Sequence, residues 1–147
     1  MPGHPQRREI FDELSAFNRK LRAAFDSLVR EHGMTLARAR VFHKLSRRDG
    51  INQRELADEL ELETPTLVRI LDAMEAQTFI ERRAVPSDRR AKQIFMTESG
   101  KVVAAEVEAL ASGVRADILQ GIPDEDIGMA LKVIRAMTAN LQNLGKS

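Results

Sequence analysis

The stretch TPTLVRILDAMEAQTFIERRAVPSDRRAKQIFMTESGK, which runs from Thr64 to Lys101, decides the fold of this chain. Its residues predict a helix, a strand, an arginine-rich turn, a second strand and the start of another helix. A helix followed by a basic β-hairpin is typical of DNA-binding proteins, because the helix fits the major groove and the hairpin tip reaches the backbone or the minor groove. The segment therefore predicts double-stranded DNA as a partner.

Two short helices separated by a three-residue turn are predicted, the first just before this stretch and the second at its start. Asn52 is expected to cap the first, with Glu55 completing a capping box, and Thr64 is expected to cap the second, with Pro65 at its first position. Helices joined this closely form a helix-turn-helix. The inward side of the second helix is predicted to hold Leu67, Ile70, Leu71 and Met74, and its outward side Pro65, Thr66, Arg69, Asp72 and Ala73.

The β-hairpin is predicted from two short strands on either side of a turn. Residues 79–82 and 92–96 are the expected strands, and residues 84–88 the break between them. Between Arg82 and Lys92 the chain carries five basic residues and a single acid, Asp88. Local charge of this kind matters more for docking on phosphates than the net charge of +1.

Amphipathic helices are predicted on both sides of this region. The apolar spacing indicates a helix over residues 7–31, ended by His32 and Gly33, and a second helix capped by Thr35. Thr97 is expected to cap a long helix to about Leu119, and a last helix is expected to carry the acids at 124–126 in its first turn. The first and last helices are apolar enough to need a partner surface. The predicted fold class is mostly α with a small β-hairpin.

Composition excludes several classes of function. The 147 residues contain no cysteine, which removes disulfides, thiol catalysis and cysteine-based zinc sites. No apolar run approaches the length of a membrane span, and the N-terminus lacks a signal-peptide pattern, so a cytoplasmic protein is expected. No catalytic set, phosphate loop or ligand cluster is recognisable, so no enzyme, cofactor or metal site is predicted. His32 and His43 are taken as ordinary histidines rather than as metal ligands.

The segments QRELADELELETPTLVRILDAMEAQ, FIERR and SDRRAKQIFMTESGK resemble the MarR family of bacterial transcription regulators, and in particular its SlyA-like branch. The likeness is close over roughly residues 35–105, and the flanking helices match in length and order. It implies a winged helix-turn-helix in a homodimer. Residues 1–31 and 102–147 would form the helical dimerisation region, and residues 32–101 the DNA-binding lobe of one intertwined domain. The function implied is a sequence-specific repressor of pseudo-palindromic operators, relieved by a small aromatic or phenolic ligand.

The resemblance also implies roles for individual residues. Arg90 would enter the minor groove at the wing tip, held by a salt bridge from Asp88. Arg69 would contact a base. The alternatives are a solvated turn at residues 88–90 and a surface pairing of Arg69 with Asp72, while Arg82 would pair within the hairpin. The remaining candidates for DNA contact are Thr64, Pro65, Thr66, Arg83, Arg89 and Lys92, with the last three on phosphates.

A small ligand, such as a phenol or an aromatic carboxylate, is expected between the dimer arms and the DNA-binding lobe. Candidate contacts are Arg8, Arg22, His32 and Arg38. A second hypothesis is a low-specificity architectural DNA-binding protein, which would contact mainly phosphates.

One position departs from the family pattern. The family usually has glycine directly after the recognition helix, where this chain has Thr78. Either this residue takes a positive φ at a cost on the order of 1 kcal/mol, or the helix ends by another route.

Overall fold

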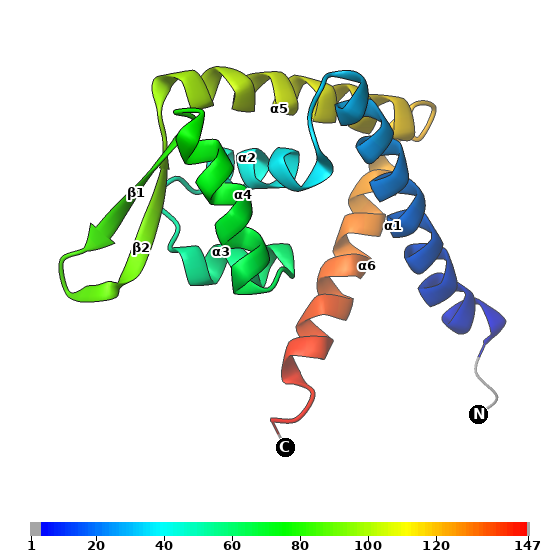
Figure 1. Cartoon of the computed structure of the whole chain (residues 1–147). Helices are drawn as coiled ribbons and strands as arrows, with labels where there is room; N and C mark the ends of the chain where they lie inside the picture. The colour runs from blue at the N-terminus through cyan, green and yellow to red at the C-terminus, as the bar shows by residue number, and fades with distance from the viewer. Residues whose placement is uncertain (1–3, 147) are drawn as a thin grey trace. The chain divides into compact units, whose positions relative to one another are not determined.

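The computed structural model describes residues 4–146 and every side chain among them except that of Arg89. Contacts divide the chain into two compact units, one ending at Gly113 and one beginning at Val114. The predicted fold class, mostly helical with one antiparallel hairpin, is confirmed (Figure 1). In chain order the elements are α1 (Pro5–Glu31), α2 (Leu36–Arg47), α3 (Gln53–Leu60), α4 (Thr64–Ala76), β1 (Ile80–Val85), β2 (Asp88–Met96), α5 (Glu98–Leu119) and α6 (Asp124–Asn143).

The core of the first unit lies where α2, α3, α4, the hairpin and the first half of α5 converge. Aliphatic side chains supply most of it, as expected for a chain without tryptophan or tyrosine. The rings of Phe42 and Phe79 meet edge to face with centroids 5.9 Å apart, an arrangement that aromatic pairs favour. The largest fully buried side chains are Phe42, Leu45, Ile51, Leu56, Leu60, Leu67, Leu71, Met74, Ile80, Ile94, Val29 and Val41.

Polar side chains begin three of the helices as predicted. The hydroxyl of Thr35 accepts from the N–H of Arg38, and that of Thr97 accepts from the N–H of Gly100. Asn52 caps α3 by accepting from the N–H of Glu55 at 2.8 Å. The Glu55 carboxylate binds the Asn52 side-chain amide at 2.7 Å, so the expected bond back to the Asn52 backbone is replaced.

The predicted cap of α4 is wrong by one residue. The carbonyl of Glu63 accepts the first helical bond, from the N–H of Leu67 at 3.1 Å, which makes Glu63 the N-cap. Thr64 is already helical, and Pro65 therefore stands at the second position rather than the first. No side chain among the described residues caps this end, so Thr64 keeps an exposed hydroxyl at the start of the helix.

The hairpin is longer than predicted. β1 and β2 pair from Ile80 with Met96 to Val85 with Asp88, and only Pro86 and Ser87 remain between them. Pairing is irregular between Ala84 and Val85, where β2 carries extra residues. Bulges of this kind bend a hairpin and increase its twist.

The loop between α2 and α3 is joined to β2 by an isolated antiparallel bridge between Asn52 and Gln93. The N–H of Gly50 donates to the carbonyl of Ile94 at 2.8 Å, and the N–H of Ile94 donates to the carbonyl of Ile51 at 2.9 Å. The carboxylate of Asp49 accepts from the N–H of Met96 at 2.9 Å. These bonds, which anchor β2 to the helical core, were not predicted from the sequence.

The second unit consists of the end of α5 and all of α6. The helices are separated by Gly121, whose φ of +79° suits glycine, and three acids occupy the first turn of α6 as predicted. Within the described chain α6 has no buried residue. Its large exposed apolar side chains are Met129, Leu131, Val133, Ile134 and Leu141.

No helix in the described part of the chain is both long enough and apolar enough to cross a membrane.

Candidate nucleic-acid interface

α3 and α4 form a helix-turn-helix, and backbone hydrogen bonds fix the turn between them. Glu61 adopts a left-handed conformation with φ +55°, and the N–H of Leu62 donates to the carbonyl of Ala57 at 3.0 Å. This pattern is a Schellman ending, which closes α3 and turns the chain sharply. The turn brings α4 against α3.

α4 divides into an inner apolar side and an outer polar side, as predicted. Leu67, Leu71 and Met74 are buried, whereas Thr66 and Arg69 are exposed. Among the described side chains, none forms a hydrogen bond or ion pair with Arg69. The alternative pairing of Arg69 with Asp72 is therefore wrong, and the guanidinium is available to an external group.

The β1–β2 hairpin, called the wing below, carries basic side chains beyond α4. Arg90 and Lys92 are exposed on β2. Arg83 on β1 lies over the ring of Phe95, 4.2 Å from its centroid, and donates to Glu81 at 3.0 Å. The side chain of Arg89 lies outside the described residues, so its expected phosphate contact remains a prediction.

Asp88 holds the wing tip in a different way from the one predicted. Its carboxylate accepts a hydrogen bond from the backbone N–H of Arg90 at 3.0 Å. No ion pair joins it to the Arg90 guanidinium, although both side chains are described. The expected salt bridge is therefore wrong. A bond from Asp to the N–H two residues on stabilises a turn, so Asp88 shapes the backbone and leaves the Arg90 side chain free to reach outward.

Arg82 connects the wing to α4. Its Nη2 donates to Asp72 Oδ1 at 2.6 Å, and its Nε donates to Glu75 Oε2 at 2.9 Å. The prediction that Arg82 pairs within the hairpin is wrong, because alternation along β1 points Arg82 toward the same side as buried Ile80. The spacing of three residues between Asp72 and Glu75, which puts both on one helix face, was the signal in the sequence.

The charges of this contact stabilise one another. Hydrogen bonding from Arg82 lowers the pKa of the Glu75 carboxyl below its usual value, although burial acts in the opposite direction. The same contact raises the pKa of Arg82, chiefly through its hydrogen bond to Glu75 and then through the one to Asp72. Arg82 and Glu75 therefore each favour the charged form of the other.

Two polar contacts tie α2 to neighbouring helices. Arg38 Nη1 donates to Gln77 Oε1 at the end of α4, at 2.7 Å. His43 Nδ1 lies 2.5 Å from Glu108 Oε1 on α5. The sequence gave no signal for the second pair, because its members are 65 residues apart. Both contacts fix the position of α2, which packs against α3 of the helix-turn-helix.

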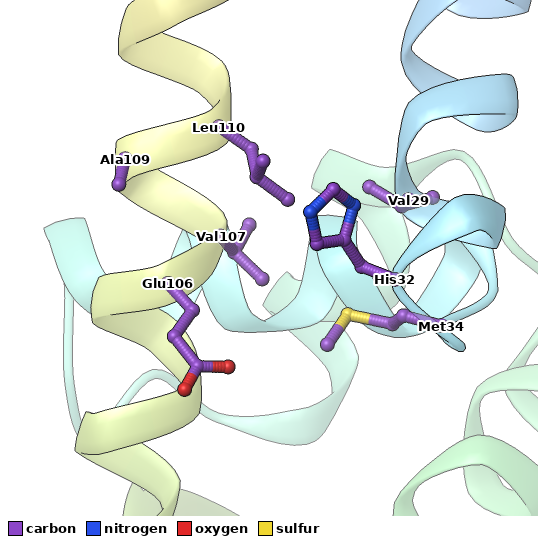
Figure 2. A pocket seen from close by; sticks show the side chains of 7 residues that line it. All are labelled: Val29, His32, Met34, Glu106, Val107, Ala109 and Leu110. Atoms are coloured by element: carbon purple, nitrogen blue, oxygen red, sulfur yellow. The ribbon is translucent and has the colours of Figure 1, made fainter.

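A small cavity of about 270 Å³ lies between the end of α1 and α5 (Figure 2). The imidazole of His32 stands between Val29 and Leu110, and its Nδ1 is bonded to the carbonyl of Leu28 at 2.9 Å. A carbonyl accepts only, so Nδ1 carries the proton and Nε2 remains for another partner. The other lining residues are Met34, Glu106, Val107 and Ala109.

The four candidate ligand residues do not meet in one pocket of the described chain. His32 lines this cavity, whereas Arg8 lines a separate shallow hollow at the start of α1. Arg38 is bonded to Gln77. Arg22 lies near Arg40, since the lowered pKa of Arg40 results from burial and then from repulsion by Arg22. A basic pocket built from these arginines is absent from the described protomer.

Comparison with known proteins assigns the family. A family model described as "MarR family" matches residues 34–92, which contain the helix-turn-helix and most of the wing. The transcriptional regulator PA3341, known from a crystal structure, is 39% identical to this chain. The match covers 91% of this chain and 98% of that one, with a TM-score of 0.81.

More distant structures share the fold. A MarR transcriptional regulator from Methanosarcina mazei Go1 is 22% identical, with 93% and 99% of the two chains covered and a TM-score of 0.79. The transcriptional regulator SlyA is 23% identical, with coverage of 90% and 93% and a TM-score of 0.75. Identity of 39% along almost the full length of a transcriptional regulator, together with the matched helix-turn-helix and wing, shows that the chain belongs to the MarR family.

Proposed function

We propose that this protein is a homodimeric regulator that binds pseudo-palindromic sites in double-stranded DNA. The observation that carries the proposal is the exposed outer side of α4 beside a basic wing in the same compact unit. α4 enters the major groove, where unpaired Arg69 makes a bidentate contact with guanine. Pro65 and Thr66 approach a thymine methyl group or a phosphate, and the exposed Thr64 hydroxyl reaches a phosphate.

The wing contacts the flanking minor groove in this proposal. Arg90 inserts into the groove, because narrow A·T-rich tracts attract guanidinium groups. Asp88 contributes indirectly by holding the backbone that presents Arg90. Arg83, Arg89 and Lys92 contact phosphates, which position the protein without specifying sequence.

We assign dimerisation to residues 1–31 and 102–147 and DNA binding to residues 32–101. Exposed apolar side chains on α1, α5 and α6 support the first assignment, with Phe11 at 63% and Leu141 at 67% exposure. Large apolar side chains exposed in this number favour a protein partner that covers them. Twofold symmetry then places the two α4 helices in major grooves about one helical turn apart.

We propose that the protein belongs to the SlyA-like branch, because its wing sequence and the order of its motifs resemble that branch. Repression through occlusion of the promoter is the output that we propose, with relief of silencing as the other output open to this branch. A ligand that binds better to a dimer whose α4 spacing mismatches DNA would release the operator.

The cavity at His32 supports a phenolic ligand. Its lining is mostly apolar, and Nε2 of His32 can accept from a hydroxyl. The carboxylate of Glu106 also lines it, so an aromatic carboxylate would meet a like charge. A neutral phenol therefore suits this cavity better than a carboxylate does.

In vitro selection of genomic fragments tests the DNA-binding part. The parent protein is expected to enrich an inverted repeat. Arg69→Ala should reduce discrimination at one base position by about 1–3 kcal/mol, and Arg90→Ala should reduce the preference for flanking A·T pairs. Equal recovery of unrelated fragments by the parent and both variants would instead indicate an architectural DNA-binding protein.

A matched ligand pair tests the cavity. Salicylamide and salicylate share a phenol and differ in charge, so salicylamide should stabilise the protein more and weaken operator binding. Glu106→Gln should raise salicylate binding, whereas Glu98→Gln, on the same helix but outside the lining of the cavity, should not. If neither compound binds, ligand relief through this cavity is ruled out.

A further inference from the structure

Arg82 makes the polar contact that crosses from the wing to α4. Its two bonds reach two carboxylates on successive turns of the helix, at 2.6 Å and 2.9 Å. The Arg82 side chain is only 20% exposed, whereas that of Arg83, the next residue on β1, is 59% exposed and pairs within its own strand. The contact of Arg82 with Asp72 and Glu75 is called the wing link below.

A single surface ion pair contributes little to stability, because solvent screens it and ordering its side chains costs entropy. The wing link differs in geometry. A planar guanidinium bonded through two different nitrogens to two carboxylates of one helix restricts orientation as well as distance. Because one partner is on β1 and the others are on α4, the restriction acts on the angle between the wing and the helix.

We infer that Arg82 is a positioning residue for DNA binding, which holds the wing so that the α4 and wing contacts fall on one DNA site together. The inference rests on the proposed function, in which α4 occupies the major groove and Arg90 the minor groove. A wing that pivots would lose conformational entropy on binding, and its minor-groove contact would contribute less affinity.

A purely electrostatic role of Arg82 and a positioning role predict opposite changes in DNA affinity for one double variant. Asp72 and Glu75 lie on the helix that approaches DNA, and their charges alone would repel phosphates. If Arg82 served only to neutralise them, Asp72→Asn with Glu75→Gln would strengthen DNA binding. If Arg82 positions the wing, the same double variant should weaken operator binding by about tenfold, despite its more favourable charge.

A double-mutant cycle with Arg90 gives the second test. Arg82→Lys keeps the charge but loses the planar fork, so the salt dependence of binding should stay as in the parent. In the Arg82→Lys background, Arg90→Ala should reduce operator affinity by about twofold or less, compared with about tenfold in the parent. Arg83→Gln is the matched control: it removes a charge from the same strand and should weaken binding on all sequences equally.

Thermal unfolding and circular dichroism establish that each variant is folded at the assay temperature. The Asp72→Asn, Glu75→Gln variant leaves the hairpin sequence intact. If Arg82→Lys does not fold, this double variant provides the test of the positioning role. An unchanged or stronger operator affinity in the double variant, or an equal cost of Arg90→Ala in both backgrounds, would overturn the positioning role. A parent protein that selects no operator, or for which Arg90→Ala has no effect, would contradict the proposed function instead.

Discussion

Thr78 shows how one residue can carry backbone strain at a junction between elements. Its φ is +64°, in the left-handed region where a β-branched side chain is unfavourable. The N–H of Phe79 donates to Met74 and that of Thr78 to Glu75, both at 2.9 Å, which is the Schellman pattern that normally ends in glycine. Of the two routes considered for this position, the helix therefore takes the strained one.

The strain is offset by bonds to the same residue. The carbonyl of Thr78 accepts from the hydroxyl of Thr97 at 2.6 Å and from that of Ser99 at 2.9 Å. These donors belong to the start of α5, so the left-handed turn is held from outside. The turn sets where β1 leaves α4, and thus the base of the wing.

Thr78→Gly is expected to stabilise the protein, because glycine takes positive φ without steric cost. The gain should be about 0.5–1 kcal/mol after the larger entropy of glycine in the unfolded chain is subtracted. Such a gain corresponds to a rise in Tm of a few degrees at most, about 2–4 °C per kcal/mol. Thr78→Ala is the control, since it removes the branch but keeps a Cβ; equal stability of the two variants would contradict the strain.

Gly100 is the second residue on which this junction depends. A Cβ at this position would lie 2.0 Å from the carbonyl oxygen of Phe79, a backbone atom that cannot move without shifting β1. Gly100→Ala should therefore destabilise the protein by about 1–3 kcal/mol in chemical denaturation. Gly113→Ala on the same helix meets no atom within 4 Å and should be neutral or stabilising. Helix propensity favours alanine at both positions, so equal stability of the two variants would contradict the destabilising effect of the close approach at Gly100.

At the scale of elements, local patterns predicted the helices but not how they are joined. Apolar periodicity placed the inner side of α4 correctly because it depends only on the helix itself. The hairpin was predicted too short, since Ala84 and Asp88 read as turn formers, yet cross-strand pairing extends through them. The backbone bonds of Gly50 and Ile51 to Ile94 depend on tertiary position, and no spacing along the chain shows them. For the link from Arg82 to α4, the spacing of Asp72 and Glu75 shows the shared helix face but not which cation meets it.

The link between β1 and α4 should respond to acid. Since the folded pKa of Glu75 lies below its usual value of 4.5, its contribution to stability is present above that value. The contribution is lost as pH falls through the lowered pKa. Thermal unfolding between about pH 7 and pH 3 should therefore show a smaller acid loss for Glu75→Gln than for the parent. The exposed Glu98→Gln variant should follow the parent, and identical profiles for all three proteins would contradict this coupling.

At the scale of the whole molecule, the second unit cannot bury its apolar side chains by itself. α6 has no buried residue among those described, and Leu131 and Ile134 are each 44% exposed. Two such helices from different protomers could cover one another, which is why the dimer is part of the proposed function. Binding of two half-sites then becomes partly intramolecular, so dimerisation contributes to operator affinity without any added DNA contact.

Charged residues introduced on the apolar side of α6 should therefore separate the protomers, and the same variants should also bind DNA more weakly. Leu131→Asp with Ile134→Asp is expected to sediment as a monomer at concentrations where the parent is a dimer. Its operator affinity should fall by about 100-fold or more, because each half-site is then bound alone. The matched control, Lys132→Gln with Arg135→Gln, makes the same change in net charge at exposed neighbours on the same helix and should leave the apolar surface intact. Since α4 and the wing lie in the other unit, binding of a single half-site should be unchanged. A variant that remains dimeric, or a monomer that keeps full operator affinity, would show that α6 does not supply the symmetry of the complex.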